Sequence, residues 1–367
     1  MLDINKFEPI FHDKVVKEKV RDTINAIWSE IVHFDWKGFQ PSAAYDTAWV
    51  GTVKNEHNKP LFPESIDWLL NNQSNDGSWG AKRSSVYICD PMLSTAAAIE
   101  TLSTYDGKFS KNIKQGLEWI NKEISQVKID DPNRSVGFEL LFPNLLLKLD
   151  KKFSLTFNID PFLKMQNLKL DKLKISHIML GTTPVLFSFE FLDNLSREIG
   201  LLQLDHQISR NGSIACSPSA TAWYIQQNSK CKLSLLQYLK SVKKKDGGFP
   251  HFSDSELFTI PYGLYAIEKS LNYLPQALHQ PIKRLKRCWT PVGVSFSEHF
   301  PVPDLDDSVL SLYLLTKYEL SGTENINRHW EVLEFYKDDE FFKVYQFESG
   351  ISHLVNIHVL DTLKSHP

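Results

Sequence analysis

The segment Pro301-Val-Pro-Asp-Leu-Asp-Asp-Ser308 runs directly into the apolar stretch Val309-Leu-Ser-Leu-Tyr-Leu-Leu315. This order predicts the start of a helix, because proline is tolerated before the first turn and an aspartate can cap the first free N–H groups. Acidic side chains are also favoured at the positive end of the helix dipole. The chain is therefore expected to contain a helix that begins with three carboxyl groups.

Helical patterns extend outward from this segment over most of the chain. Apolar residues at 20, 24, 27, 28 and 31 form the stripe of an amphipathic helix. Further helices are expected at 66–70, 95–102, 113–120, 221–225, 233–239, 260–271 and 309–315. Convincing alternating strand patterns are scarce, so the fold class is predicted to be all-α.

A turn pattern repeats loosely between these helices, at residues 73–80, 207–213 and 245–249. Each copy places Asp-Gly, Asn-Gly or Gly-Gly where the backbone must turn, followed by an apolar or aromatic residue. Repeated helix pairs that share one turn favour an α/α barrel, although a helical array with a binding role would show the same turns.

Composition limits the function classes. The 367 residues are 42% hydrophobic, enough for two cores, and the net charge of -3 gives no electrostatic reason to expect a nucleic-acid partner. The four cysteines are too widely spaced for a metal knuckle and are expected to be reduced. The first residues lack the pattern of a signal or transit peptide, and no transmembrane segment is found, so a cytoplasmic protein is predicted.

The three acids of the segment 304–307 have two interpretations. They can be an ordinary helix cap. Alternatively, crowded carboxyl groups cannot all ionise, so one of them holds its proton near neutral pH and could protonate an alkene in an apolar cavity. The three groups would then titrate as one coupled system.

Other segments support the second interpretation. Gln40-Pro-Ser-Ala-Ala-Tyr-Asp-Thr-Ala-Trp-Val50 resembles the S-x-Y-D-T-A-W signature of class II diterpene cyclases, the copalyl diphosphate synthase type, and Asp304-Leu-Asp-Asp307 resembles their D-x-D-D motif. The segments 138–143, 182–188, 217–222 and 246–250 also resemble this family, over roughly residues 40 to 362. The resemblance implies α/α-barrel domains of the βγ type: an inserted helical domain at 41–285, and an incomplete second barrel from 1–40 and 286–367.

The resemblance also implies roles for individual residues. Asp306 would be the proton donor, Asp304 and Asp307 would tune it, and Asn356 would orient it by a hydrogen bond. The substrate would be a linear prenyl diphosphate, geranylgeranyl or the shorter farnesyl diphosphate. Glu139 lies in the segment that resembles a Mg²⁺-linked site, and Lys169 would bind the diphosphate, which fits the preference of this cofactor and ligand for oxygen and cationic groups.

Aromatic side chains suit a cavity that must guide a carbocation. Trp289, Phe296, Phe187 and Trp223 are the candidates, and each has an ordinary core interpretation. Some relatives remove the final proton with a His and Asn pair, but this chain has Phe187 and His251 at those positions. The product is therefore left open between another stereoisomer, a rearranged skeleton and water capture. The D-D-x-x-D cluster of ionisation-initiated synthases is absent, so the diphosphate should survive.

Alternatives from other classes stay open. The chain could be a non-catalytic helical module that binds an isoprenoid or a partner protein, a squalene-type triterpene cyclase, or, less plausibly, a protein prenyltransferase subunit. The family's chains continue beyond the segment that ends at Leu363. We therefore expect the isolated chain to be weakly active, as a truncated product, a minimal cyclase, or one half completed by a second polypeptide.

Overall fold

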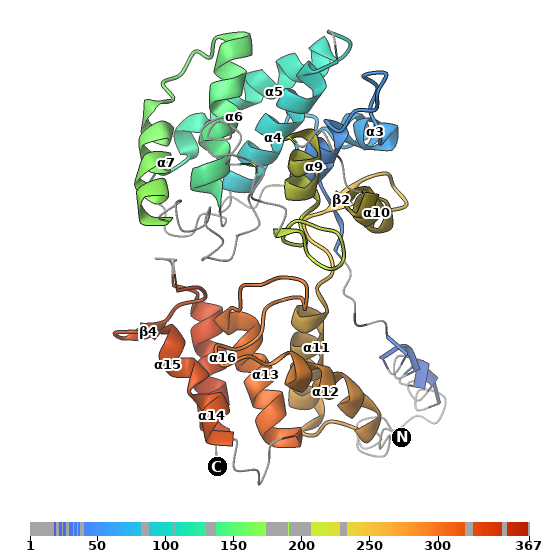
Figure 1. Cartoon of the computed structure of the whole chain (residues 1–367), viewed down its shortest axis with the longest axis vertical. Coiled ribbons are helices and arrows are strands. Elements are labelled where there is room, and N and C mark those ends of the chain that lie inside the picture. The colour runs from blue at the N-terminus through green and yellow to red at the C-terminus, as the bar shows by residue number, and fades with distance from the viewer. Residues whose placement is uncertain are drawn as a thin grey trace.

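The computed structural model of the chain describes most of its residues. The described parts are positions 18, 19, 22, 23, 25, 26, 29–31, 33, 34 and 36, the ranges 40–81, 88–105, 107–129, 137–173, 207–227, 233–319, 326–346 and 351–365, and residue 190. In these parts the chain is mostly helical, as the sequence predicts, and the helices form two groups (Figure 1).

The first group, drawn in blue to yellow, contains the helices between residues 44 and 242, whereas the described helical residues at 18–31 lie beside the second group, where Ile31 and Trp36 pack (Figure 1). Its helices are α2 (Ala44–Gly51), α3 (Pro63–Asn71), α4 (Cys89–Ser103), α5 (Ser110–Glu123), α6 (Phe138–Phe153), α7 (Asp160–Leu173), α9 (Pro218–Gln227) and α10 (Leu233–Val242). Helix α2 is buried along its whole length and packs against α3, α4 and α9. It therefore forms the centre of this group, and the S-x-Y-D-T-A-W segment lies in its core.

The second group contains the helices after residue 255. They are α11 (Glu256–Leu271), α12 (His279–Cys288), α13 (Leu305–Tyr318), α14 (Ile326–Trp330), α15 (Val332–Tyr336) and α16 (His353–Lys364). A short pair, β3 (Lys337–Asp338) and β4 (Phe341–Phe342), precedes α16. Helix α13 packs against α11, α12 and α16, and two apolar clusters lie along it. The D-x-D-D helix is therefore the central element of the second group.

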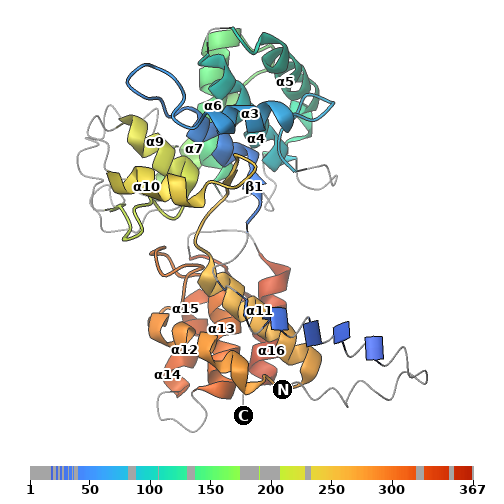
Figure 2. The ribbon, with the colours of Figure 1, turned by 90° about the vertical axis from the view of Figure 1, so that its right-hand side faces the viewer.

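Figure 2 shows the two groups from the side, with the chain crossing between them. Near the crossing, β1 (Ser42–Ala43) pairs antiparallel with β2 (Phe249–Pro250). Helices α11 and α12 were expected in the inserted domain, but they share an apolar cluster with α13. The division between the groups therefore lies between Pro250 and Glu256 and not at residue 286. The position of this division is determined by the packing of α11 and α12 against α13, which cannot be read from the order of the helices in the sequence.

The repeated turn is confirmed in detail. In each copy a backbone N–H donates to the carbonyl oxygen of the residue four positions later. These hydrogen bonds run from Ser74 to Ser78 at 2.8 Å, from Ser209 to Ser213 at 2.8 Å, and from Lys244 to Gly248 at 2.9 Å. A glycine with positive φ occupies the same place each time, for example Gly212 at φ 84°, where an added Cβ would lie 2.4 Å from the Ser234 carbonyl oxygen. The three turns are thus one structural unit used three times.

Two general expectations can be checked on the described residues. Cys89, Cys216 and Cys288 are free thiols, and Cys231 lies outside the described residues. None of the described helices is long and apolar enough to cross a membrane.

Candidate active site

The three acids lie at the first turn of α13, and the helix-cap interpretation is confirmed. Asp304 is the N-cap, and its Oδ1 accepts a hydrogen bond from the backbone N–H of Asp307 at 2.8 Å. Asp304 and Asp307 are buried, whereas Asp306 is partly exposed. The sequence therefore buries two carboxyl groups beneath a third that other molecules can reach.

The buried pair resists ionisation. Burial, followed by the nearby Asp306 carboxylate, raises the pKa of Asp304 to about 7, although its contact with Asp307 opposes the shift. Burial and then the charges of Asp304 and Asp306 raise the pKa of Asp307 well above its usual value. Asp307 Oδ1 has no hydrogen-bond partner among the described residues. Ionising both groups would leave two unpaired charges in the interior, so this pair holds a proton near neutral pH.

Asp306 faces a different environment. Burial raises the pKa of its carboxyl group, while a hydrogen bond from Tyr262 and the proximity of His358 pull the pKa the other way. The Tyr262 hydroxyl, on α11, donates to Asp306 Oδ1 in a short hydrogen bond. One carboxyl oxygen of Asp306 is thus bound by the Tyr262 hydroxyl.

Asn356 does not take the orienting role expected from the resemblance. Its Oδ1 accepts from the Phe342 N–H at 2.9 Å, and its Nδ2 donates to the carbonyl oxygens of Phe342 and Ser352, both at 2.9 Å. The amide therefore fastens β4 to the start of α16. The hydrogen bond to Asp306 comes from Tyr262 instead, a residue that the sequence analysis did not select.

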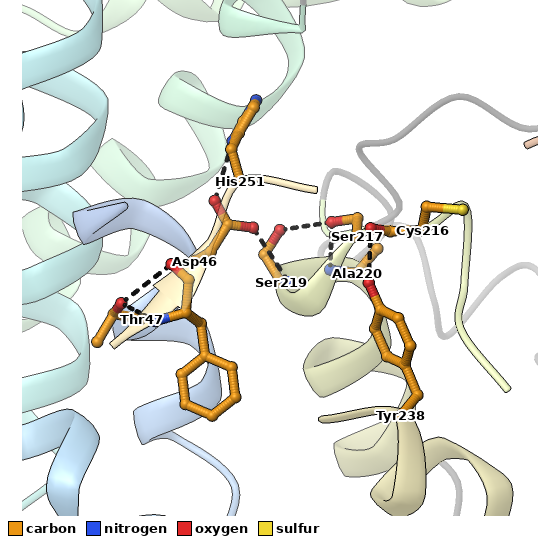
Figure 3. Close-up of polar contacts among 9 residues, drawn as sticks. Asp46, Thr47, Cys216, Ser217, Ser219, Ala220, Tyr238 and His251 are labelled. Atoms are coloured by element: carbon orange, nitrogen blue, oxygen red, sulfur yellow. Dashed lines mark hydrogen bonds and ion pairs between the residues drawn. The ribbon is translucent and has the colours of Figure 1, made fainter. Parts of the chain in front are cut away.

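A second polar cluster lies in the first group (Figure 3). Asp46 of α2 is completely buried, and its Oδ2 lies 2.9 Å from His251 Nδ1. Its Oδ1 accepts the Ser219 N–H at 3.3 Å. His251 follows β2, and 64% of its side chain is exposed. Desolvation lowers the pKa of His251, but the Asp46 carboxylate outweighs this and raises it overall.

Two further titratable groups adjoin Asp46. Glu190 is buried, and burial raises its pKa to about 8, with a smaller contribution from the Asp46 charge. Tyr45 is also buried, and burial, followed by the charges of Glu190 and Asp46, raises its pKa well above 10. Burial therefore disfavours the ionised forms of Glu190 and Tyr45, the two groups beside the Asp46 and His251 pair.

A row of aromatic rings runs from this cluster to the acids. His251 lies 5.9 Å from Phe252, ring centre to ring centre, and Phe252 lies 4.9 Å from Phe296. The Phe296 carbonyl accepts from the Phe258 N–H at 3.1 Å, and the Phe258 ring stacks on Tyr262 at 4.4 Å. Tyr262 then bonds Asp306, so ring contacts on either side of one backbone hydrogen bond connect the two polar clusters.

The remaining selected residues are placed as follows. Trp289 is half-buried beside both apolar clusters of α13, and its ring lies 5.2 Å from that of His329 at an interplanar angle of 33°. Trp223 is fully buried in the first core. Phe187 lies outside the described residues, and of Lys169 only the place in α7 is described. Glu139 is in the first turn of α6 and is half-buried. The structure thus brings Phe296 and His251 into one row with Asp306.

The described residues offer a divalent metal no ready-made cluster of protein ligands. Among the residues that the structure describes, no three His, Cys, Asp or Glu side chains gather closely enough to hold a metal ion. A single carboxylate such as Glu139 still fits Mg²⁺, because this ion often takes one or two protein carboxylates, several waters and the oxygens of a phosphate ligand. The donor set therefore fits a metal that arrives with a diphosphate.

Comparisons with known proteins find similar sequences and similar folds. No family model matches the chain. The chain is 30% identical over 340 residues to the chloroplastic kolavenyl diphosphate synthase TPS5 of Vitex agnus-castus, covering 90% of this chain and 41% of that protein. It is 29% identical over 327 residues to ent-copalyl diphosphate synthase 2 of Isodon eriocalyx, covering 86% of this chain and 40% of that protein.

Solved structures show the same fold. The crystal structure of ent-copalyl diphosphate synthase from Arabidopsis thaliana, in complex with (S)-15-aza-14,15-dihydrogeranylgeranyl thiolodiphosphate, matches with a TM-score of 0.74 at 21% identity, over 93% of this chain and 49% of that chain. The chain thus spans about two fifths of the length of its curated relatives. Its relatives are diterpene cyclases, which are enzymes, and it has the helical fold of terpene cyclases.

Proposed function

We propose that the chain carries the site of a class II diterpene cyclase, in which Asp306 protonates the terminal alkene of a linear prenyl diphosphate. The observation that carries this proposal is the carboxyl cluster of α13, where two buried acids stand behind a third that is partly exposed. Burial keeps protons on groups that would otherwise ionise, and an alkene is protonated only by an acid that holds its proton in an apolar setting.

Tyr262 supports this task by its position. Its hydroxyl donates to Asp306 Oδ1, which fixes the plane of the carboxyl group and leaves the second oxygen for the alkene. It also stabilises the carboxylate that remains once the proton has moved. Asp304 and Asp307 act through their charge, because an ionised neighbour raises the pKa of the donor.

The aromatic row supplies what the resulting cation needs. Phe258, Phe296 and Phe252 present ring faces rather than nucleophiles, and ring faces attract a positive charge without reacting with it. A cation formed near Asp306 would thus have aromatic surface on the way to His251.

His251 is suited to accept the final proton. Asp46 holds its Nδ1, as an orienting carboxylate holds the base in other enzymes, and its exposed ring leaves Nε2 for a substrate. Relatives place an Asn here, according to the resemblance described above. The difference supports a product other than the one those relatives make.

The substrate class follows from the relatives. Geranylgeranyl diphosphate is the proposed substrate, and farnesyl diphosphate is the shorter alternative; the Arabidopsis relative was solved with a geranylgeranyl thiolodiphosphate analogue. Glu139 would contribute to holding Mg²⁺, which supplies positive charge to the diphosphate when bound. Lys169 is proposed to contact the same diphosphate. The diphosphate group remains on the product.

The test is incubation of the chain with each prenyl diphosphate and Mg²⁺, followed by dephosphorylation of the products and mass spectrometry. A cyclic alcohol of unchanged carbon number supports the proposal. Isoprenoid binding without turnover would favour the non-catalytic binding module, and products from squalene alone would favour a triterpene cyclase. The proposed compartment is the cytoplasm, which microscopy of a tagged chain would test.

A further inference from the structure

The loop that precedes α9 contains two consecutive residues in a conformation that L side chains rarely adopt. Ala215 and Cys216 have φ values of 50° and 57°, and both are buried. Such residues persist only where surrounding contacts hold them, and they gather at functional sites. The contacts that hold this loop therefore indicate what it positions.

Tyr238 of α10 holds the loop by its hydroxyl group (Figure 3). The hydroxyl donates to the Cys216 carbonyl oxygen at 2.6 Å, and the Ser253 carbonyl oxygen lies 3.0 Å from the same hydroxyl. The Ser253 N–H closes the arrangement by donating to the Cys216 carbonyl oxygen at 2.9 Å. Only 3% of Tyr238 is exposed, and burial raises the pKa of its phenol well above 10. The phenol therefore stays a donor that joins two backbone segments.

Both segments lead to the pair formed by Asp46 and His251. The segment at Ser253 carries His251 two residues earlier. The other segment continues through Ser217, whose Oγ lies 2.9 Å from Ser219 Oγ, and the Ser219 N–H donates to Asp46 Oδ1 at 3.3 Å. The phenol thus connects the segment that carries the imidazole with the loop that binds the carboxylate (Figure 3).

We propose that Tyr238 is a positioning residue, which fixes His251 relative to Asp46 and thereby decides which proton the cyclic cation loses. The inference rests on the proposed cyclase function, in which His251 takes the final proton. The hydroxyl of Tyr238 is buried and lies against two carbonyl oxygens, so it acts through His251 and not on the substrate.

The step that Tyr238 steers is a choice between neighbouring hydrogens. His251 Nε2 takes a proton from a carbon beside the cationic centre, and the electron pair of the broken C–H bond forms the double bond of the product. The imidazolium then gives this proton to water, which its exposed ring can reach. Misplacing a reacting group by about 1 Å can change a rate by about a hundredfold. Because Asp306 starts each cycle at the other cluster, a shift of His251 should alter the product ratio more than total turnover.

The test compares two tyrosines whose hydroxyls both bond backbone carbonyls. Tyr238→Phe removes one hydroxyl, and the Cys216 carbonyl keeps the Ser253 N–H as a partner, so the variant should fold. With geranylgeranyl diphosphate, the ratio of product isomers, or of alkene to hydroxylated product, should change by about fivefold or more, while total consumption stays within about threefold of the parent. Tyr105→Phe is the matched control, because Tyr105 donates to the Gly51 carbonyl at 2.6 Å, and it should leave the ratio unchanged.

A double variant shows whether Tyr238 acts through the base. In a His251→Ala chain, the further change Tyr238→Phe should leave the product ratio within about twofold of that of His251→Ala alone. Ser217→Ala removes the hydroxyl beside Ser219 and should also shift the parent's product ratio. This variant carries the test if Tyr238→Phe does not fold.

A titration of His251 by NMR needs no turnover. Desolvation lowers the pKa of His251, and the Asp46 carboxylate raises it overall. Because Tyr238→Phe loosens the contact with Asp46, the pKa of His251 should fall in this variant. The control variant should leave that pKa unchanged.

Three results would overturn the inference: a product ratio that neither Tyr238→Phe nor Ser217→Ala changes, an equal change in the control, or the same change in the absence of the His251 imidazole. An unchanged His251 pKa in an active Tyr238→Phe enzyme would also remove the positioning role. A parent chain that forms no cyclic product overturns the proposed function instead, and the titration then still shows whether Tyr238 places His251.

Discussion

Asp306 differs from Asp304 and Asp307 in two respects that decide its role: it is the only one of the three that a substrate can reach, and a phenol holds one of its oxygens. One carboxyl oxygen of Asp304 accepts a hydrogen bond from the backbone of its own helix, as an N-cap side chain does. The same three residues therefore serve as a helix start and as an acid cluster, which is why the pattern alone left both interpretations open.

Replacing the acid tests the chemistry without disturbing the fold. Asp306→Asn should lower turnover by about two orders of magnitude or more, because the amide matches the carboxyl group in size but delivers no proton. The melting temperature should stay near that of the parent. Asp67→Asn, on the exposed face of α3, is the control and should retain full activity. Turnover of Asp306→Asn within tenfold of the parent would assign the proton donor to another group.

Glu190 gives a prediction for stability against pH. Its pKa is ordinary in the unfolded chain and about 8 in the folded one, so between about pH 4.5 and 8 the folded state holds more protons than the unfolded state. Stability therefore falls as the pH rises through this window. Glu190→Gln should reduce this fall, seen as a smaller difference in the free energy of unfolding between pH 5 and pH 8.

The exposed Glu334 provides the control for that measurement, since Glu334→Gln should leave the pH dependence as it was. An unchanged slope in Glu190→Gln would mean that Glu190 ionises in the folded state as easily as in water.

At the scale of elements, local signals predicted more than long-range ones. The turns at 73–80, 207–213 and 245–249 and the helix start at Asp304 follow from residues adjacent in sequence, and the structure confirms them. The surroundings of Asp306 come from α11 and α16, two helices that are distant in sequence and that both pack on α13.

Asn356 shows why the surroundings of Asp306 could not be predicted from the sequence. Positions 356 and 358 of one helix differ by about 200° in direction, so they face opposite sides. Asn356 faces β4, whereas His358 packs against Tyr262, whose hydroxyl bonds Asp306. No spacing rule in the sequence told which of the two would lie on the inner face.

Helix α16 also has an apolar face that the described chain does not cover. Val359 is fully buried, whereas Leu354, Ile357 and Leu360 are 54%, 58% and 67% exposed. Ile357→Ser with Leu360→Ser should leave the free energy of unfolding within about 0.5 kcal/mol of the parent and reduce self-association in sedimentation. Val359→Ser on the same helix should cost about 2–3 kcal/mol, because it places a hydroxyl in the core. Equal costs would mean that the exposed face is covered in solution.

At the scale of the whole molecule, the length of the relatives and the exposed apolar face of α16 are considered together. The chain aligns with about two fifths of its curated relatives and about half of the solved Arabidopsis chain. The resemblance led to the expectation of an incomplete second barrel, and α16 of the second group exposes several large apolar residues.

The last prediction therefore concerns added polypeptide. A C-terminal segment from a longer relative, fused after α16 or supplied as a separate chain, should bury the apolar face and exclude water from Asp306. An acid in a drier site keeps its proton more firmly, and a cation there meets fewer water molecules, so turnover should rise and hydroxylated by-products should decrease. Binding of a fluorescent hydrophobic dye should fall in the same samples. The Ile357→Ser and Leu360→Ser pair is the control, because it should weaken the effect of a segment supplied in trans. If the 367-residue chain alone is monomeric and turns over as fast as the fused protein, the apolar face has no part in completing the site, and a minimal cyclase is the better description.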